Sequence, residues 1–182
     1  MPRRSVRVIL LCEDRHQENL VAHYLKKAKL ASPREIRVRK SPHGAAEQFV
    51  RENYPDELAE LRRRAHQRNL RLIVVIDADV GTVENRRAQL DASCKKADVT
   101  PRRESDRVAV LIPKRNVDTW IWFLLGNDVE EDEDYKGLVK DAHCKDAAAR
   151  LTEFREKGWQ IPEGCPTSLG IAAAEFSAIE RT

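Results

Sequence analysis

The feature that most constrains the fold of this chain is the apolar run 72–76 (LIVVI), which leads directly into Asp77-Ala78-Asp79. A run that is apolar at every position is typical of a strand buried on both faces, as in a parallel sheet covered by helices. Such a strand carries its ligand-binding residues just beyond its carboxyl end. Because side chains alternate along an extended backbone, the spacing predicts that Asp77 and Asp79 point in the same direction.

Acidic residues also follow the first apolar run, in which positions 8–12 lead into Glu13 and Asp14. If both runs form neighbouring parallel strands, Glu13, Asp77 and Asp79 converge at one edge of the sheet. Unbalanced carboxylates would repel one another, whereas Mg²⁺ or Mn²⁺ would accept their oxygens as ligands. The sequence therefore predicts a site for a hard divalent cation.

Further titratable residues lie near these acids in the sequence. Glu18 and Glu84 are candidates for a second metal ligand set or for an outer role around the first. His16, His43 and His143 have no sequence neighbours that would favour a role as general base.

The order of apolar runs and amphipathic stretches predicts an α/β fold. Strands and helices alternate, as in a mostly parallel sheet of about four strands with helices on both faces. Strands are expected at 6–11, 36–40, 70–76 and 107–112. Helices are expected at 13–27 after a polar turn, and at 45–68, 83–96, 117–124, 140–157 and 168–181. Pro55 is expected to divide the second helical stretch.

Composition predicts a water-soluble protein in the cytoplasm. Charged residues make up 35% of the chain, the mean hydropathy is -0.60, and the net charge is +3. The sequence has neither the roughly 20 consecutive apolar residues of a membrane span nor a signal peptide. The four cysteines form no C-x-x-C pair and are expected to be reduced and structural. A zinc site at His143, Cys144 and Cys165 is the alternative, which no paired spacing supports.

Together these segments resemble the Toprim domain of topoisomerases, bacterial primases and overcoming-lysogenization-defect (OLD) type nucleases. The segment 12–18 (CEDRHQE) stands where that family has a strand-end glutamate, with Asp14 in place of the usual glycine, and 75–79 (VIDAD) matches its D-x-D strand. The segment 112–120 (IPKRNVDTW) resembles the P-x-x-N-x-E-x-W motif of small stand-alone Toprim-like proteins, with Asp118 replacing glutamate.

The resemblance covers about residues 6–125 and implies phosphodiester chemistry with two Mg²⁺ or Mn²⁺ ions. It implies that Glu13, Asp77 and Asp79 are the catalytic metal ligands. Lys114 or Arg115 would neutralise charge on the phosphoryl group. Residues 1–126 are then the Toprim-like catalytic domain. Residues 127–182 form a solvated acidic loop at 128–134 and a helical C-terminal extension packed on the same domain.

Clusters of basic residues predict contact with a polyanion, either DNA or RNA. The predicted nucleic-acid-binding residues are Arg37, Arg39, Lys40, Arg86, Arg87 and Arg115. Further arginines cluster at 62–64, 68, 71 and 102–103. The alternative is a set of solvated helix faces on which Glu57, Glu60 and Glu104 balance the arginines.

These features lead us to expect a metal-dependent nuclease that hydrolyses DNA or RNA. The OLD resemblance implies the effector of an anti-phage or anti-plasmid complex with an ABC-type ATPase, through which the chain would oligomerise. Two alternatives remain, a small Toprim ribonuclease of RNA maturation and a non-catalytic nucleic-acid-binding subunit of an ATPase complex. Strand rejoining is not expected, since Tyr24, Tyr54 and Tyr135 lie in helix or acidic-loop contexts.

Overall fold

The computed structural model describes residues 6–42 and 44–180, which form an α/β fold around one parallel sheet. All the strand pairs are parallel, and the strand order is β2-β1-β3-β4, which confirms the predicted architecture. The strands are β1 Arg7–Cys12, β2 Ile36–Lys40, β3 Leu70–Val75 and β4 Val108–Leu111. This architecture is consistent with a Rossmann-like, Toprim-type fold.

The direction in which the chain adds strands reverses between β1 and β3. From β1 the chain moves outward to β2, returns to the other side of β1 as β3, and then adds β4. Leu10 in β1 therefore pairs with Val38 in β2 and with Ile73 in β3. Ligands in open α/β sheets bind beyond the carboxyl ends of the strands at this kind of reversal, so the end of β1 and β3 is where a site is expected.

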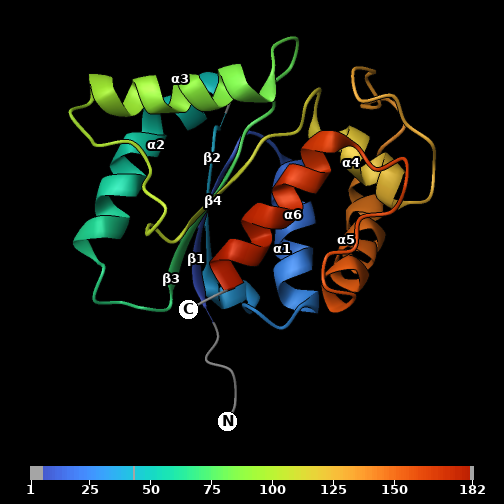
Figure 1. The fold of residues 1–182 in the computed structure, drawn as a ribbon, viewed down its shortest axis with the longest axis horizontal. Helices are drawn as coiled ribbons and strands as arrows, with labels where there is room; N and C mark the ends of the chain where they lie inside the picture. The colour runs from blue at the N-terminus through green and yellow to red at the C-terminus, as the bar shows by residue number, and fades with distance from the viewer. Residues whose placement is uncertain (1–5, 43, 181–182) are drawn as a thin grey trace.

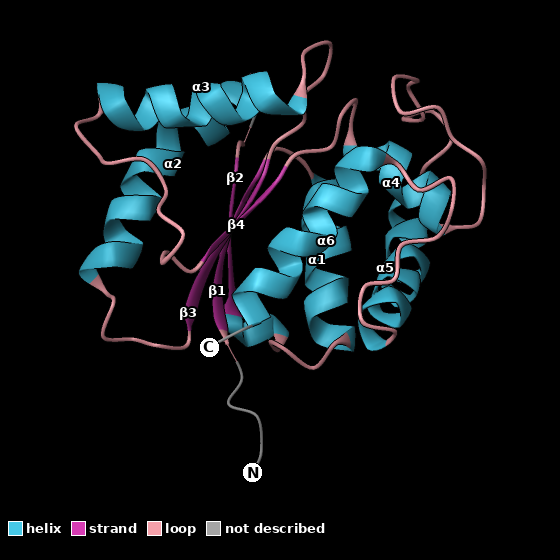
Figure 2. Cartoon of the chain, in the orientation of Figure 1, coloured by secondary structure: helices cyan, strands magenta, loops and turns pink. Residues whose placement is uncertain are grey.

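Helices cover both faces of the sheet, as Figures 1 and 2 show. One face is covered by α2 (Ala46–Arg63) and α3 (Val83–Lys96), and the other by α1 (Arg15–Lys27), α4 (Val117–Leu124), α5 (Asp141–Glu156) and α6 (Thr167–Glu180). A short 3₁₀ helix, η1 (Pro33–Glu35), leads into β2.

The central strands alternate between the two cores. In β1, Val8 and Leu10 belong to the core beneath α1, while Ile9 and Leu11 belong to the core beneath α2 and α3. β3 is buried at every position, including Arg71. Burial on both faces explains why these strands are apolar throughout rather than alternating.

Pro55 does not divide the second helical stretch, and that expectation was wrong. Helix α2 continues through Pro55 and ends at Arg63, five residues before the predicted end. Proline removes one helical hydrogen bond, but Tyr54, Leu58 and Leu61 are buried against the sheet on the same helix. Their packing outweighs the local cost of proline.

The C-terminal helices complete the core beneath α1. Helix α5 packs against α1 and α4, and α6 packs against β4. Trp120, Leu151 and Phe176 belong to one buried cluster, and the Trp120 Nε1–H donates to Ser168 Oγ at 2.9 Å. Helices α5 and α6 are therefore integral to the packed fold.

The structure also bears on two other predictions, the state of the cysteines and the membrane-spanning segments. All four cysteines are free thiols, as expected, and Cys144 lies buried in the core of α5. No helix in the described residues is both long and apolar enough to cross a lipid bilayer. His43 and Arg181, which the sequence placed in a loop and at the end of the last helix, lie outside the described residues.

Candidate functional site

The structure brings Glu13 and Asp77 together at the reversal point of the sheet. Glu13 directly follows β1, and Asp77 lies two residues beyond the end of β3. The Asp77 backbone N–H donates to Glu13 Oε1 at 2.5 Å, which joins the carboxyl ends of the two central strands. We call Glu13, Asp77 and Asp79 the acid centre.

Gln17 holds this arrangement from the first turn of α1. Its side-chain amide donates to Asp77 Oδ1 at 2.9 Å, and its Oε1 accepts from the Glu13 backbone N–H at 2.8 Å. Asp14 is the N-cap of α1 and accepts from the Gln17 backbone N–H. Sequence reasoning missed Gln17, although Asp14 followed three residues later by glutamine is the spacing of a capping box.

Asp79 occupies a different environment from Asp77. The backbone turns at Asp79, which has a φ of 55°, so the extended alternation assumed for the D-x-D segment ends before it. The Asp79 side chain is 48% exposed, and its Oδ2 lies 3.7 Å from Arg86 Nη2. The turn closes at Gly81, where a Cβ would lie 3.1 Å from the Ala78 carbonyl oxygen.

Burial controls the charge of the acid centre. Desolvation raises the pKa of Glu13 to about 7, against the opposing hydrogen bond from Asp77 and with added repulsion from Asp79. Desolvation is also the main cause that raises the pKa of Asp77 well above its usual value, followed by repulsion from Glu13. These shifts favour the protonated carboxyls near neutral pH, whereas a nearby cation would favour their charged forms.

Lys114 reaches the turn that carries Asp79. Its Nζ donates to the Gly81 carbonyl oxygen at 2.9 Å and to Asp132 Oδ1 at 2.7 Å. Arg115 beside it is half-buried. The predicted basic residue after β4 therefore lies next to the D-x-D turn, with its charge paired to the acidic loop.

The acidic segment 128–134 is exposed, as expected, but it also makes specific contacts. In addition to the Asp132–Lys114 pair, Asp134 accepts from Asn116 Nδ2 at 3.0 Å, and Glu131 accepts from the Ser168 backbone N–H at 2.7 Å. The segment thus ties the start of α4 to the start of α6.

The other two predicted metal ligands, Glu18 and Glu84, take no part in the contacts between Glu13 and Asp77. Glu18 accepts a hydrogen bond from Lys40 Nζ at 2.5 Å, linking α1 to β2. Glu84 is exposed in the first turn of α3, and no hydrogen bond among the described residues joins it to Glu13 or Asp77.

The donor chemistry of the acid centre fits a hard cation such as Mg²⁺ or Mn²⁺, because all its ligands would be carboxylate oxygens. Among the residues that the structure describes, no three metal-ligating side chains are already positioned around a common point. The Glu13 carboxylate is instead engaged by the Asp77 amide. Glu13, Asp77 and Asp79 are the residues that would hold a cation here.

A second polar group lies beside the acid centre, and sequence reasoning missed it. His16 Nδ1 lies 2.5 Å from Asp118 Oδ1, and His16 Nε2 lies 3.3 Å from Asp141 Oδ1. Asp118 is buried in the first turn of α4, which raises its pKa, although His16 opposes the shift. These residues border an open pocket with Asp14 and Lys136. Their partners are more than 100 positions away in the sequence, so no local pattern indicated the cluster.

Most of the predicted nucleic-acid-binding residues form ion pairs within the chain. Arg39 pairs with Glu57, and Lys40 with Glu18. Arg86 is buried and pairs with Glu47 close to the acid centre. Arg37, which is exposed on β2, and the half-buried Arg115 form no ion pair with the described residues.

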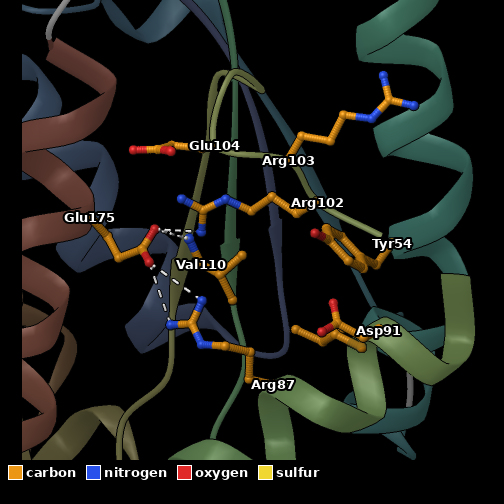
Figure 3. Close-up of a pocket in the computed structure, with 9 residues that line it drawn as sticks. Tyr54, Arg87, Asp91, Arg102, Arg103, Glu104, Val110 and Glu175 are labelled. Atoms are coloured by element: carbon orange, nitrogen blue, oxygen red, sulfur yellow. Dashed lines mark hydrogen bonds and ion pairs between the residues drawn. The ribbon is translucent and has the colours of Figure 1, made fainter. Parts of the chain in front are cut away.

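Arg87 belongs to a cluster at the open edge of β4 (Figure 3). Glu175 of α6 accepts from the Val110 backbone N–H at 3.1 Å and from Arg102 Nη1 at 2.7 Å, and its Oε1 lies 3.4 Å from Arg87. Figure 3 shows both guanidinium groups directed at this carboxylate. Glu175 thus takes the place of a neighbouring strand at this position of the sheet edge.

Comparison with known proteins found no match to this chain among family models, curated proteins or solved structures.

Proposed function

We propose that this protein is a metal-dependent nuclease that hydrolyses phosphodiester bonds in DNA or RNA. The observation that carries the proposal is the contact of Glu13 with Asp77 at the reversal point of the sheet, with Asp79 beside them. Strand-end carboxylates at such a point are suited to hold cations over a bound phosphate.

The raised pKa values of Glu13 and Asp77 favour binding of a cation at the acid centre. Burying two carboxyls next to each other is costly unless their charges are compensated. Arg86 supplies part of this compensation, since its charge opposes the rise in the pKa of Glu13. A bound divalent cation lowers the pKa of a coordinated water and withdraws charge from phosphoryl oxygens.

The proposal gives each residue of the site a defined role. Glu13, Asp77 and Asp79 would hold the cation, and Gln17 keeps the Asp77 carboxylate oriented by its hydrogen bond. Lys114 lies where its Nζ can exchange Asp132 for a phosphate oxygen, because the Asp132 side chain is 82% exposed. Exchange of one exposed anion for another costs little.

The test is a cleavage assay with plasmid DNA, single-stranded DNA and structured RNA, each with Mg²⁺ or Mn²⁺. We expect cleavage of at least one substrate, lost by more than 100-fold in Asp77→Asn. Asp146→Asn, a change at an exposed position on α5, is the matched control and should retain full activity. Cleavage that survives Asp77→Asn would exclude the acid centre as the catalytic site.

A non-catalytic nucleic-acid-binding subunit is the second candidate. It is favoured by the present pairing of Glu13 with the Asp77 amide and of Lys114 with Asp132. This candidate predicts nucleic-acid binding with no cleavage under any metal condition. A role as effector of an ATPase-coupled defence complex, or as a ribonuclease of RNA maturation, depends on the Toprim resemblance alone.

A further inference from the structure

A basic pocket lies at the end of the sheet opposite the acid centre. It is formed where β1, β2 and β3 begin, and it has a volume of about 280 Å³. The polar side chains among its lining residues are Arg7, Arg34, Glu35, Arg37, Arg64 and Asn69. This volume is at the lower limit of small-molecule sites, so it suits a compact group rather than a large ligand.

The arginines of this pocket have few acidic partners among the residues that the structure describes. Four arginines line it together with one acid, Glu35, whose carboxylate accepts from the Ser32 backbone N–H at 2.7 Å. Across the described parts of the chain, no ion pair involves Arg7, Arg34 or Arg37. Arg64 lies 3.8 Å from the carboxylate of Glu60, and its Nη2 donates to the neutral Gln67 Oε1 at 2.8 Å.

The pocket at the edge of β4 (Figure 3) is also rich in arginines, but there the positive charges are balanced by acidic residues. There, three arginines share the lining with three acids, which are Asp91, Glu104 and Glu175. Two of those arginines are held by Glu175. Within the described residues, the basic cluster at β4 is therefore neutralised, and the cluster at the start of β1 and β2 keeps an excess of positive charge.

Two further arginines, Arg71 and Arg107, contact or follow the segment that carries the lining residues Asn69 and Leu70. Arg107 donates to the carbonyl oxygens of Ala65 and Gln67, in the segment that leads to Asn69. Burial and the charge of Arg107 together lower the pKa of Arg71 to about 10. These like charges repel one another and add to the positive potential near the pocket.

We propose that this pocket binds a phosphate group, and specifically a backbone phosphate of a nucleic acid. Guanidinium groups bind phosphate through two parallel hydrogen bonds, and Arg34 and Arg37 are both exposed. The pocket volume accepts the phosphate while the sugar and base remain outside. Contacts of this kind anchor a strand without reading its sequence.

This site is separate from the acid centre. Arg7 begins β1 and Glu13 follows its end, which places them about 20 Å apart at roughly 3.3 Å per residue. A nucleic-acid strand that reached both sites would therefore contact the pocket and the acid centre through two different phosphates. The proposal does not depend on cleavage, because the pocket would bind nucleic acid in a protein whose acid centre is inactive.

The test measures binding of a fluorescent single-stranded oligonucleotide to the full chain without divalent cations. In the Arg34→Gln/Arg37→Gln double variant we expect binding at least tenfold weaker. The slope of log affinity against log salt should also fall by roughly 0.7, the value for one lost phosphate contact on a single strand. The control is Arg63→Gln/Arg150→Gln, which removes two exposed arginines that have acidic partners, and it should change affinity less than twofold.

Calorimetry with inorganic phosphate identifies the source of the ligand. Phosphate binding that requires Arg34 and Arg37, without oligonucleotide binding, would support the phosphate site and assign it to a free phosphate. Equal losses in both double variants, or binding of neither probe, would overturn the proposal. Loss of cleavage in Asp77→Asn tests the acid centre, and loss of oligonucleotide affinity in Arg34→Gln/Arg37→Gln tests the pocket, so a failed nuclease proposal and a failed pocket proposal give different results.

Discussion

The backbone N–H of Asp77 donates to the side-chain Oε1 of Glu13 at 2.5 Å, across the gap between the ends of β1 and β3. The two residues are 64 positions apart in the sequence, and the parallel pairing of their strands brings them together. Since both carboxyls have raised pKa values, their protonation is coupled to the stability of the fold.

Stability of the metal-free protein should therefore fall as pH rises. The folded protein keeps a proton on Glu13 up to about pH 7, whereas the unfolded chain releases it near pH 4.5, so the folded state binds more protons between these values. The stabilisation is fully present below pH 4.5 and lost by about pH 7, with a change on the order of 3 kcal/mol. Thermal unfolding across this range measures it. Glu13→Gln should flatten the curve and Glu84→Gln should not; an unchanged slope in Glu13→Gln would contradict the assignment.

Replacing Glu175 should destabilise the fold strongly. Glu175→Ala leaves the Val110 N–H without its acceptor and removes the partner of Arg87 and Arg102, at a cost of about 2–4 kcal/mol. Urea denaturation measures the loss. Glu153→Ala is the control, because Glu153 pairs with Arg150 while both side chains are half-exposed, and it should cost less than about 0.5 kcal/mol. Equal effects would show that Glu175 does not fasten α6 to the sheet edge.

The contact between His16 and Asp118 should contribute more to folding stability than the contact between His16 and Asp141. Asp118→Ala leaves the half-buried His16 Nδ1 unpaired and should cost about 1–3 kcal/mol. Asp141 is 43% exposed, so Asp141→Ala should cost about 0.5 kcal/mol or less. Chemical denaturation of the two variants compares them. A larger loss for Asp141→Ala would reverse this order of importance.

Freeing Lys114 should strengthen binding of nucleic acid at the acid centre. Asp132→Asn removes the exposed partner of Lys114 and should raise affinity up to about fivefold, the size of one surface ion pair. Lys114→Gln should lower affinity. Fluorescence anisotropy with the catalytically inactive Asp77→Asn background measures both without cleavage. An increase of the same size in Asp146→Asn would mean that net charge alone is responsible.

The sequence predicted the strands, because complete burial requires continuous apolar runs. Leu72, Ile73 and Val74 are inaccessible to solvent on both faces, and each was predicted as strand. The parallel order followed from alternating helices and strands, and it placed Glu13 near Asp77. Pro55 was misjudged because its effect depends on packing against the sheet, which local propensity does not include.

Side-chain partners were harder to predict than backbone positions. Glu18, predicted to bind metal, pairs with Lys40, predicted to bind nucleic acid. Arg86, also predicted to bind nucleic acid, pairs with Glu47. The left-handed turn at Asp79 also escaped prediction, since only the closure of the chain onto Gly81 requires it. Ion pairs between residues that are distant in the sequence depend on the folded conformation of the connecting loops, which a short sequence motif does not specify.

The most direct test of the central claim is a crystal structure of the protein soaked with Mn²⁺, with anomalous scattering used to locate the metal. We predict a peak between the ends of β1 and β3, within coordination distance of carboxylate oxygens of Glu13 and Asp77, and its absence in Asp77→Asn. Ordered Mn²⁺ found only elsewhere on the molecule, or an unchanged peak in Asp77→Asn, would contradict the account.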